Sequence, residues 1–221
     1  MPGFAEKRYN INDGETLGGI FDDANIGNII YSSANPSIAS VDSNGRVTGV
    51  KKGSARITAE CGGKKYTTTV NVYSPVITAG SEALMLLDNK ALNLSVKNGN
   101  GKTQWTSSNE TVATVSNGRE KALAKGVAVI TAENNGRKMD CTVRVCNVPR
   151  FDQKQYNVNT GDSVEVAITK DDDLTGVEYS VSNSKVAVID NNGVVTGLKK
   201  GSVTVTAKIA GKKYTTKVTV L

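Results

Sequence analysis

The chain of 221 residues contains 27 lysines and arginines against 21 acidic residues, which gives a formal net charge of +6, and it has no histidine. Without histidine it lacks the commonest general base and the commonest metal ligand, which excludes Ser-His-Asp triads, cysteine-histidine pairs and histidine-bound zinc. The excess positive charge is spread along the chain and is not interleaved with aromatic residues, so the composition argues against a nucleic-acid-binding face.

The first residues, MPGFAEKRYN, lack the apolar run of a secretory signal. No later stretch approaches the roughly 18 apolar residues that a membrane span needs. We therefore expect a chain that carries no export signal and does not insert into a membrane. An opening strand is predicted over residues 9–17, and the glycine-rich residues 17–21 then lead into a loop that residues 22–27 lengthen.

An aromatic strand is predicted next, around Tyr31, followed by a short apolar run at 38–41 that precedes Asn44-Gly45. An Asn-Gly pair between alternating runs is a strong hairpin signal, because both residues accept positive φ. Residues 55–61 and 66–72 then alternate apolar and polar side chains on either side of a glycine turn. This alternation predicts a second hairpin with one buried face.

The chain repeats this series of elements. The segment NGRVTGVKKGS at 44–54 returns as NGVVTGLKKGS at 192–202, and NGREKALAKG at 117–126 is a shorter, divergent copy between them. Tyr31, Trp105 and Tyr179 also fall at equal steps of 74 residues. A fixed period of this length indicates tandem units. We predict three domains, at residues 1–75, 76–149 and 150–221.

Each predicted domain contains about seven short strands with frequent turn signals and an aromatic residue in the third strand, and no helical period persists. This combination is typical of an immunoglobulin-like sandwich. The predicted fold class is all-β, with three tandem immunoglobulin-like β-sandwiches of about seven strands each. In the middle copy Glu120-Lys121-Ala122 replaces the Val-Thr-Gly of the other two copies, so we expect an altered hairpin there.

The order of these motifs resembles the bacterial Ig-like domain of group 2, the BIG2 type. It runs from an aromatic-x-Ser-x-Asn segment through NGxVTGxKKG and VTxTA to GKKYxxxVxV. The resemblance covers essentially the whole chain as three copies and is strongest in the first and third. It implies a role in one of two settings, because such domains are found in bacterial surface adhesins and in bacteriophage virion proteins.

The three cysteines, Cys61, Cys141 and Cys146, are odd in number and fall at unrelated positions of the copies. A disulfide framework is therefore not expected. Cys141 aligns with Thr68 and Thr216, which predicts a small core residue. The lysine pairs at 51/52, 64/65, 199/200 and 212/213 lie beside turn glycines, and we interpret them as solvated turns.

Asp171-Asp172-Asp173 is the one acidic cluster that suggests a cation. Consecutive carboxylates in a loop cannot all face one ion, and the spacing of a calcium loop is absent. We therefore predict a solvated loop with weak charge pairing to the Lys212-Lys213 turn. No phosphate-binding glycine motif is found either. The sequence predicts no enzymatic activity, no catalytic or metal-binding residues and no cofactor.

Aromatic residues that do not recur in the copies are the candidates for partner binding, because interface anchors are enriched in aromatic side chains. Phe4 in the amino-terminal arm and Phe21 in the atypical segment of the first domain are the two candidates. The alternative is that both pack beneath a loop or at a domain junction. Other features private to one copy are the arm at 1–8, the segment at 18–27, the Glu120 hairpin and the Asp171 loop.

The expected function is a non-enzymatic accessory or decoration protein of a bacteriophage virion, made in the host cytoplasm and docked on the capsid or tail. The unpaired thiols and the lack of an export signal or anchor favour this setting. The expected partners are capsid or tail shell proteins or a host surface receptor, with surface glycans as a further class, and neither nucleic acid nor a membrane.

Two alternatives remain open. The first is a stalk or tip fragment of an adhesin at the bacterial cell surface. The second is a carbohydrate-binding module, which needs a flat row of exposed aromatic residues that the alternation does not offer.

Overall fold

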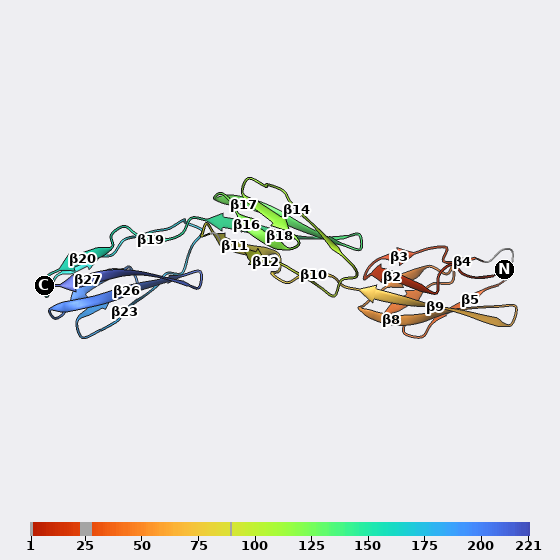
Figure 1. Ribbon diagram of the computed structural model, residues 1–221. Coiled ribbons are helices and arrows are strands. Elements are labelled where there is room, and N and C mark those ends of the chain that lie inside the picture. Colours follow the sequence, from red (N-terminus) through yellow and green to blue (C-terminus); the bar gives the residue numbers. More distant parts are fainter. Residues whose placement is uncertain (1, 23–27, 89) are drawn as a thin grey trace. The chain divides into compact units, whose positions relative to one another are not determined.

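The computed structural model describes residues 2–22, 28–88 and 90–221, and the regular structure of these residues is entirely β-strand (Figure 1). The chain forms two compact units. Unit 1 comprises Met1–Ala83, Ala91–Lys121 and Val127–Val143, and unit 2 comprises Leu84–Lys90, Ala122–Gly126 and Arg144–Leu221. The domain boundaries after residues 75 and 149 stay a prediction. We use repeats 1, 2 and 3 for residues 1–75, 76–149 and 150–221 to name equivalent positions.

Each repeat contributes nine strands within the described residues. Those of repeat 1 are β1 (Gly3–Phe4), β2 (Arg8–Asn12), β3 (Thr16–Leu17), β4 (Phe21–Asp22), β5 (Ile30–Ser33), β6 (Ala39–Val41), β7 (Val47–Gly49), β8 (Gly53–Cys61) and β9 (Lys64–Tyr73). Those of repeat 2 are β10 (Val76–Ile77), β11 (Glu82–Leu86), β12 (Leu92–Asn93), β13 (Val96–Lys97), β14 (Thr103–Ser107), β15 (Ala113–Ser116), β16 (Arg119–Ala122), β17 (Gly126–Asn134) and β18 (Arg137–Cys146). Those of repeat 3 are β19 (Arg150–Phe151), β20 (Gln155–Val158), β21 (Ser163–Glu165), β22 (Ile168–Thr169), β23 (Glu178–Val181), β24 (Ala187–Ile189), β25 (Val194–Gly197), β26 (Gly201–Ile209) and β27 (Lys212–Val220).

The same three sheets recur in every repeat. The four-stranded sheets run β2-β9-β8-β5, β11-β18-β17-β14 and β20-β27-β26-β23, and the three-stranded sheets run β3-β7-β6, β12-β16-β15 and β21-β25-β24. These two sheets hold seven strands, which confirms the predicted immunoglobulin-like sandwich. The remaining two strands pair as β1-β4, β10-β13 or β19-β22. Strands of two residues are too short for alternation to reveal them in the sequence.

Within the four-stranded sheet, the edge strand near the start of the repeat pairs parallel with the final strand of the repeat, as β2 does with β9 and β20 with β27. The long hairpin of β8 and β9 pairs Ala55 with Val70 and Ile57 with Thr68. These side chains are buried, while those between them are more exposed. The predicted alternation therefore sets the register, because one face of the sheet must lie on the core.

The Asn-Gly turns differ between the repeats. In repeat 2 both Asn117 (φ 50°) and Gly118 (φ 78°) have positive φ, as in a two-residue hairpin turn. In repeat 1 only Gly45 of the pair does, and the Asp42 carboxylate accepts hydrogen bonds from the backbone amides of residues 44 and 46. The predicted alteration of the middle hairpin is therefore confirmed. Its turn is one residue shorter, because repeat 2 lacks an equivalent of Asp42.

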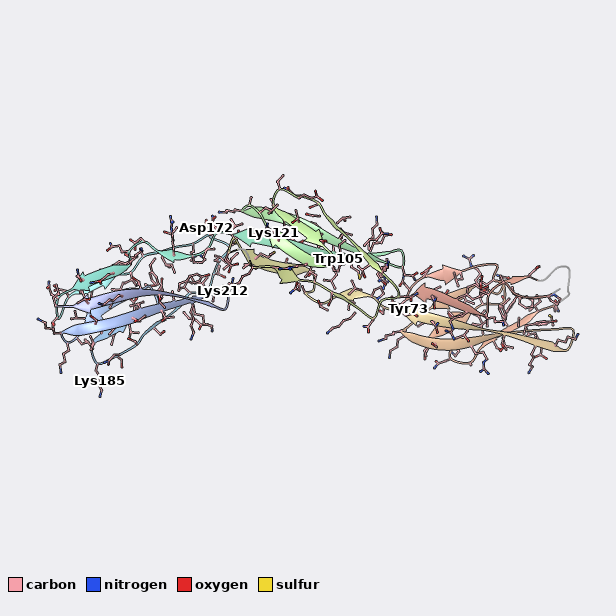
Figure 2. The ribbon with its side chains drawn as sticks, viewed as in Figure 1. Tyr73, Trp105, Lys121, Asp172, Lys185 and Lys212 are labelled. Carbon is pink, nitrogen blue, oxygen red and sulfur yellow. The ribbon has the colours of Figure 1, made fainter. Side chains whose placement is uncertain are left out.

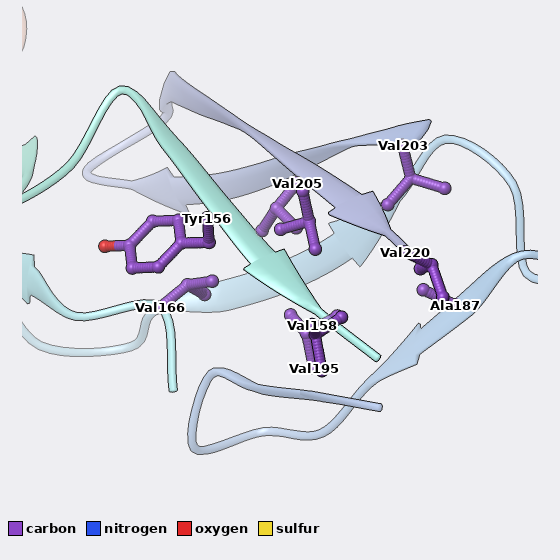
Figure 3. Packing of buried hydrophobic residues seen from close by; sticks show 9 residues of the cluster. Tyr156, Val158, Val166, Ala187, Val195, Val203, Val205 and Val220 are labelled. Atoms are coloured by element: carbon purple, nitrogen blue, oxygen red, sulfur yellow. The ribbon is translucent and has the colours of Figure 1, made fainter. Parts of the chain in front are cut away.

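The core of repeat 3 lies between its two larger sheets (Figure 3). Its buried members are mostly β-branched, as half-buried strands favour. They are Tyr156, Val158, Val166, Ala187, Val195, Val203, Val205, Val218 and Val220. Repeat 1 has an equivalent core that includes Ile11, Val47, Ile57, Val70 and Val72.

The recurring aromatic residues and the cysteines lie as their sequence positions suggest. Tyr31, Trp105 and Tyr179 are half-buried and pair across strands with Ala59, Ala132 and Ala207 respectively. All three cysteines are buried and unpaired, and Cys141 is a core residue as predicted.

Candidate functional site

Phe4 and Phe21 lie against each other. Strands β1 and β4 pair them directly, and their rings meet edge to face with centroids 5.0 Å apart. Phe21 is 8% exposed and also contacts the rings of Tyr31 and Tyr66. These rings therefore pack at the end of repeat 1, as the alternative interpretation described. Partner binding by Phe4 and Phe21 stays a prediction.

The pair of two-residue strands that holds Phe4 and Phe21 also occurs in the other two repeats, and we call it the ribbon. In repeat 3 the ribbon pairs Phe151 with Ile168, and in repeat 2 it pairs Ile77 with Val96. Sequence comparison missed this equivalence because repeat 1 has a different length between the ribbon and the aromatic strand. Of the candidate segment 18–27, residues 23–27 lie outside the described residues.

The most informative polar contacts join consecutive repeats. Lys52 Nζ donates to Asn98 Oδ1 at 2.6 Å, within unit 1. Lys125 Nζ donates to Asp171 Oδ1 at 2.7 Å, within unit 2. Each pair is separated by 46 residues, and each lysine immediately precedes the glycine that begins a long hairpin. A lysine at the equivalent position therefore donates a hydrogen bond to the next repeat at both junctions.

A second contact runs in the opposite direction along the chain. The Arg137 guanidinium binds the carboxylate of Asp13 and donates to its carbonyl oxygen at 3.0 Å. Lys212, which follows the equivalent turn of repeat 3 (Figure 2), donates to the Asp88 carboxylate. Both pairs are separated by 124 residues. The Lys212 ammonium holds the pKa of Asp88 below its usual value.

The junction within unit 1 is otherwise polar. Asn12 is buried, and its Nδ2 donates to the carbonyl oxygen of Asn135 at 2.8 Å. The Ser74 hydroxyl donates to Asp13 Oδ2 at 2.7 Å. Asp13 therefore receives hydrogen bonds both from the linker and from the next repeat.

The junction within unit 2 adds an apolar cluster of Leu86, Cys146, Leu174 and Ile209. Beside it, Asp171 accepts a hydrogen bond from the backbone amide of Asn147 at 2.6 Å. The hydrogen bond from Lys125 is the largest of the effects that lower the pKa of Asp171, and the Asn147 amide adds to it.

The prediction of a solvated Asp171 loop paired with Lys212-Lys213 is wrong. The Asp171 side chain is only 10% exposed and binds Lys125. Asp173 pairs with Arg144 at 3.3 Å. Only Asp172 has no ion pair among the described residues of this cluster. Lys52 is exposed, as predicted, but it also binds Asn98. Lys212 is only partly exposed and binds Asp88, so the prediction of a solvated turn is wrong there. Sequence spacing alone does not show which side chains two repeats bring together.

No group of three or more cysteine, aspartate or glutamate side chains is placed to hold a metal ion within residues 2–22, 28–88 and 90–221. The same residues include no helix long and apolar enough to cross a membrane. The altered hairpin of repeat 2 instead carries Glu120 into the core.

The model of the bacterial Ig-like domain (group 2) family matches residues 16–71 and 152–220, more than half of the chain. The chain belongs to this family. Repeat 2 lies outside the matched ranges, in line with its divergent sequence at Glu120.

Two curated relatives contain a similar segment. The chain is 29% identical over 215 residues to Ice-binding protein 1 of Shewanella frigidimarina, covering 86% of this chain and 24% of that protein. It is 29% identical over 163 residues to an uncharacterised protein of Clostridium acetobutylicum, covering 65% of this chain and 16% of that protein. The chain thus spans a quarter or less of the curated relatives that it matches.

Solved structures of tandem Ig-like proteins align with the chain. Invasin, a bacterial integrin-binding protein, aligns with a TM-score of 0.45 and 16% identity over 99% of this chain and 58% of that one. The titin fragment I67–I69 aligns with a TM-score of 0.36 and 14% identity over 99% of this chain and 97% of that one. This fold is typical of non-enzymatic structural and adhesion proteins.

Proposed function

We propose that the chain is a non-enzymatic structural and interaction protein in which group 2 Ig-like repeats act in series as a spacer between an attachment point and a binding partner. The observation that carries this proposal is the repeated pair of junction contacts. At both junctions a lysine donates a hydrogen bond to a residue 46 positions later in the chain, and a basic residue binds an aspartate 124 positions earlier. Contacts of this kind restrict motion between consecutive repeats.

Small-angle X-ray scattering tests the spacer role. Replacing Asp13 and Asp171 together with alanine removes an acceptor from each junction, and we expect a broader distribution of interatomic distances than in the wild-type chain. The matched control replaces Glu110 and Asp172, exposed acidic residues with no ion pair among the described residues. Identical scattering from the junction variant and the control would contradict the spacer role.

The setting we propose first is a bacteriophage virion, with one terminal repeat docked on capsid or tail shell proteins. The three free, buried thiols support assembly in a reducing cytoplasm, where disulfides are rare. Mass spectrometry of purified virions tests this setting. Absence of the chain from virions that form in cells expressing it would overturn it.

The second setting is a segment of a bacterial surface protein. The relative from Shewanella frigidimarina is named for ice binding and is about four times as long as the matched segment, which supports a place within a longer protein. Antibody labelling of intact cells tests this setting. A carbohydrate-binding role receives less support, because the exposed large hydrophobic side chains of the described residues are all aliphatic.

A further inference from the structure

Glu120 is an acidic residue in a position that the other repeats reserve for valine. On β16 it lies opposite Leu92 of β12. The equivalent cross-strand pairs are Leu17 with Val47 in repeat 1 and Val164 with Val195 in repeat 3. The Glu120 side chain is 0% exposed, and neither of its carboxyl oxygens has a hydrogen-bond partner among the described residues.

Repeat 2 differs from repeat 3 at a second core position. The Thr142 amide donates to the carbonyl of Ser81, as Lys217 does to that of Lys154. This register places Ala83 of repeat 2 where repeat 3 has Tyr156. Tyr156 and Val195 belong to one core cluster of repeat 3. At these two positions repeat 2 has alanine and glutamate in place of tyrosine and valine.

The surroundings of Glu120 offer little to stabilise a negative charge. Burial raises its pKa from the ordinary 4.5 to about 7, and no cation opposes this shift. Of the titratable groups on the neighbouring strands, the Cys141 thiol on β18 interacts with Glu120. Burial raises the pKa of this thiol, and the charges of Glu120 and of Glu82 on β11 raise it further. Arg119 and Lys121, the neighbours on β16, are exposed (Figure 2).

Most of the buried side chains on β17 and β15 are apolar. On β17 they are Ala128, Ile130 and Ala132, and on β15 Ala113 is buried. The one buried polar residue of β17, Asn134, forms its hydrogen bonds with Asn100 and Thr103. A carboxylate in such surroundings loses its hydration without gaining a partner. The protonated form avoids most of this cost.

We propose that Glu120 makes repeat 2 a pH-responsive element, most stable in mildly acidic solution with the buried carboxyl protonated and loosened in neutral to alkaline solution as it ionises. Between the unfolded and folded pKa values the unfolded chain binds fewer protons, so stability falls as pH rises. The stabilising contribution is fully present below about pH 4.5 and lost above about pH 7.

This response reaches the junctions along the chain. Strand β16 leads to Lys125, and the turn before β18 carries Arg137, so loosening repeat 2 loosens an anchor of each junction. The inference does not depend on whether the protein works on a virion or on a cell surface.

The chain contains its own reporter for the test. Trp105 on β14 is the only tryptophan, and its ring lies against the Gly118 turn that leads to Glu120 (Figure 2). Urea unfolding of the full chain, followed by Trp105 fluorescence, measures the stability of repeat 2. From about pH 5 to about pH 8 we expect the folding equilibrium constant to fall on the order of a hundredfold.

The variant Glu120→Gln should lose this pH dependence, because an amide of the same shape does not titrate. The matched control Glu110→Gln, at an exposed position of the same repeat, should keep it. An equal fall in Glu120→Gln and in the wild type would overturn the proposal.

A second measurement holds even if Glu120→Gln does not fold. The carboxyl carbon of Glu120 in the wild-type chain can be titrated by NMR. A midpoint near 7 is expected, and a midpoint near the ordinary 4.5 would equally overturn the proposal.

Discussion

Repeats 2 and 3 have the same sheets in the same strand order but differently composed cores. In repeat 3 the Tyr156 hydroxyl donates to the carbonyl of Ala167 at 3.3 Å, and its ring packs in one cluster with Val195. Burial is the main reason that the pKa of Tyr156 rises to about 12. In repeat 2 these two positions hold Ala83 and Glu120. The fold therefore depends on alternation and turns, while a core position can change from valine to glutamate if the buried carboxyl is protonated.

Placing the glutamate of repeat 2 into repeat 3 should have the largest effect. Val195→Glu puts a carboxyl into the apolar cluster of repeat 3, and we expect a loss of about 4 kcal/mol at neutral pH. A small sandwich does not tolerate such a loss. Hydrogen exchange of peptides from residues 150–221 should show repeat 3 exchanging throughout.

Val188→Glu is the matched control for this substitution. Val188 lies on β24 of the same repeat and is 42% exposed, so a charge there remains in water. Its effect should stay within about 0.5 kcal/mol. Equal exchange in the two variants would show that burial of the carboxyl is not the cause.

The turns offer the next comparison. An alanine Cβ at Gly118 would lie 2.3 Å from the carbonyl oxygen of Leu94, a backbone atom that cannot move alone. At Gly193 the nearest atom is 3.1 Å away, on the ring of Tyr179, which can shift. Both glycines have positive φ, so that cost is common to the two variants. We expect a loss of about 3 kcal/mol for Gly118→Ala and about 1 kcal/mol for Gly193→Ala.

Urea unfolding measures both losses, with Trp105 fluorescence for repeat 2 and hydrogen exchange for repeat 3. If Gly193→Ala proved the more damaging, the clash with the Leu94 carbonyl would not be the dominant effect.

The sequence predicts the features that depend on neighbouring residues. Alternation and glycine turns fix the hairpins, and the 74-residue period gives the repetition of the fold. The burial of Glu120 was also within reach, because it aligns with Val47 and Val195 in a strand whose inward face is apolar. The expected hairpin change at this position is confirmed, while the inward orientation of the Glu120 side chain was not predicted.

The junctions could not be predicted in the same way. Arg137 and Asp13 meet only because two folded repeats bring their ends together, and the turn position that Arg137 shares with Lys212 does not reveal the acceptor. The position shared by Lys52 and Lys125 was a usable signal, since each precedes the glycine of a long hairpin. Its partner differs, however, from an amide at Asn98 to a carboxylate at Asp171, so the repeat did not identify it.

Restoring the valine sharpens the core comparison. Glu120→Val gives repeat 2 the residue that repeats 1 and 3 have at this position. At about pH 8 the change removes a buried carboxylate that has no hydrogen-bond partner among the described residues, so we expect repeat 2 to gain about 2 kcal/mol, measured by urea unfolding with Trp105 fluorescence. At about pH 5, where the carboxyl is protonated, the gain should be smaller. An equal gain at the two pH values would show that ionisation of Glu120 is not the cause.

The smallest effect is expected at the junction in unit 2. Asp171→Ala removes the acceptor of the Asn147 amide and the partner of Lys125, so the Asn147 amide should exchange several-fold faster by NMR. Asp172→Ala, its exposed neighbour, should leave that rate unchanged.

The pH response of this junction has the opposite sign to that of repeat 2. The pKa of Asp171 is lowered, so its contribution is present above the ordinary value of 3.8 and is lost as the pH falls through the folded value. Protection of the Asn147 amide should therefore decline in acid, where protonation of Glu120 strengthens repeat 2. A decline of equal size in Asp171→Ala would remove Asp171 as the cause. If the decline disappears in that variant, acid weakens the junction between repeats 2 and 3 while it stabilises the core of repeat 2. Both contributions are then retained only at pH values between the titration of Asp171 and that of Glu120.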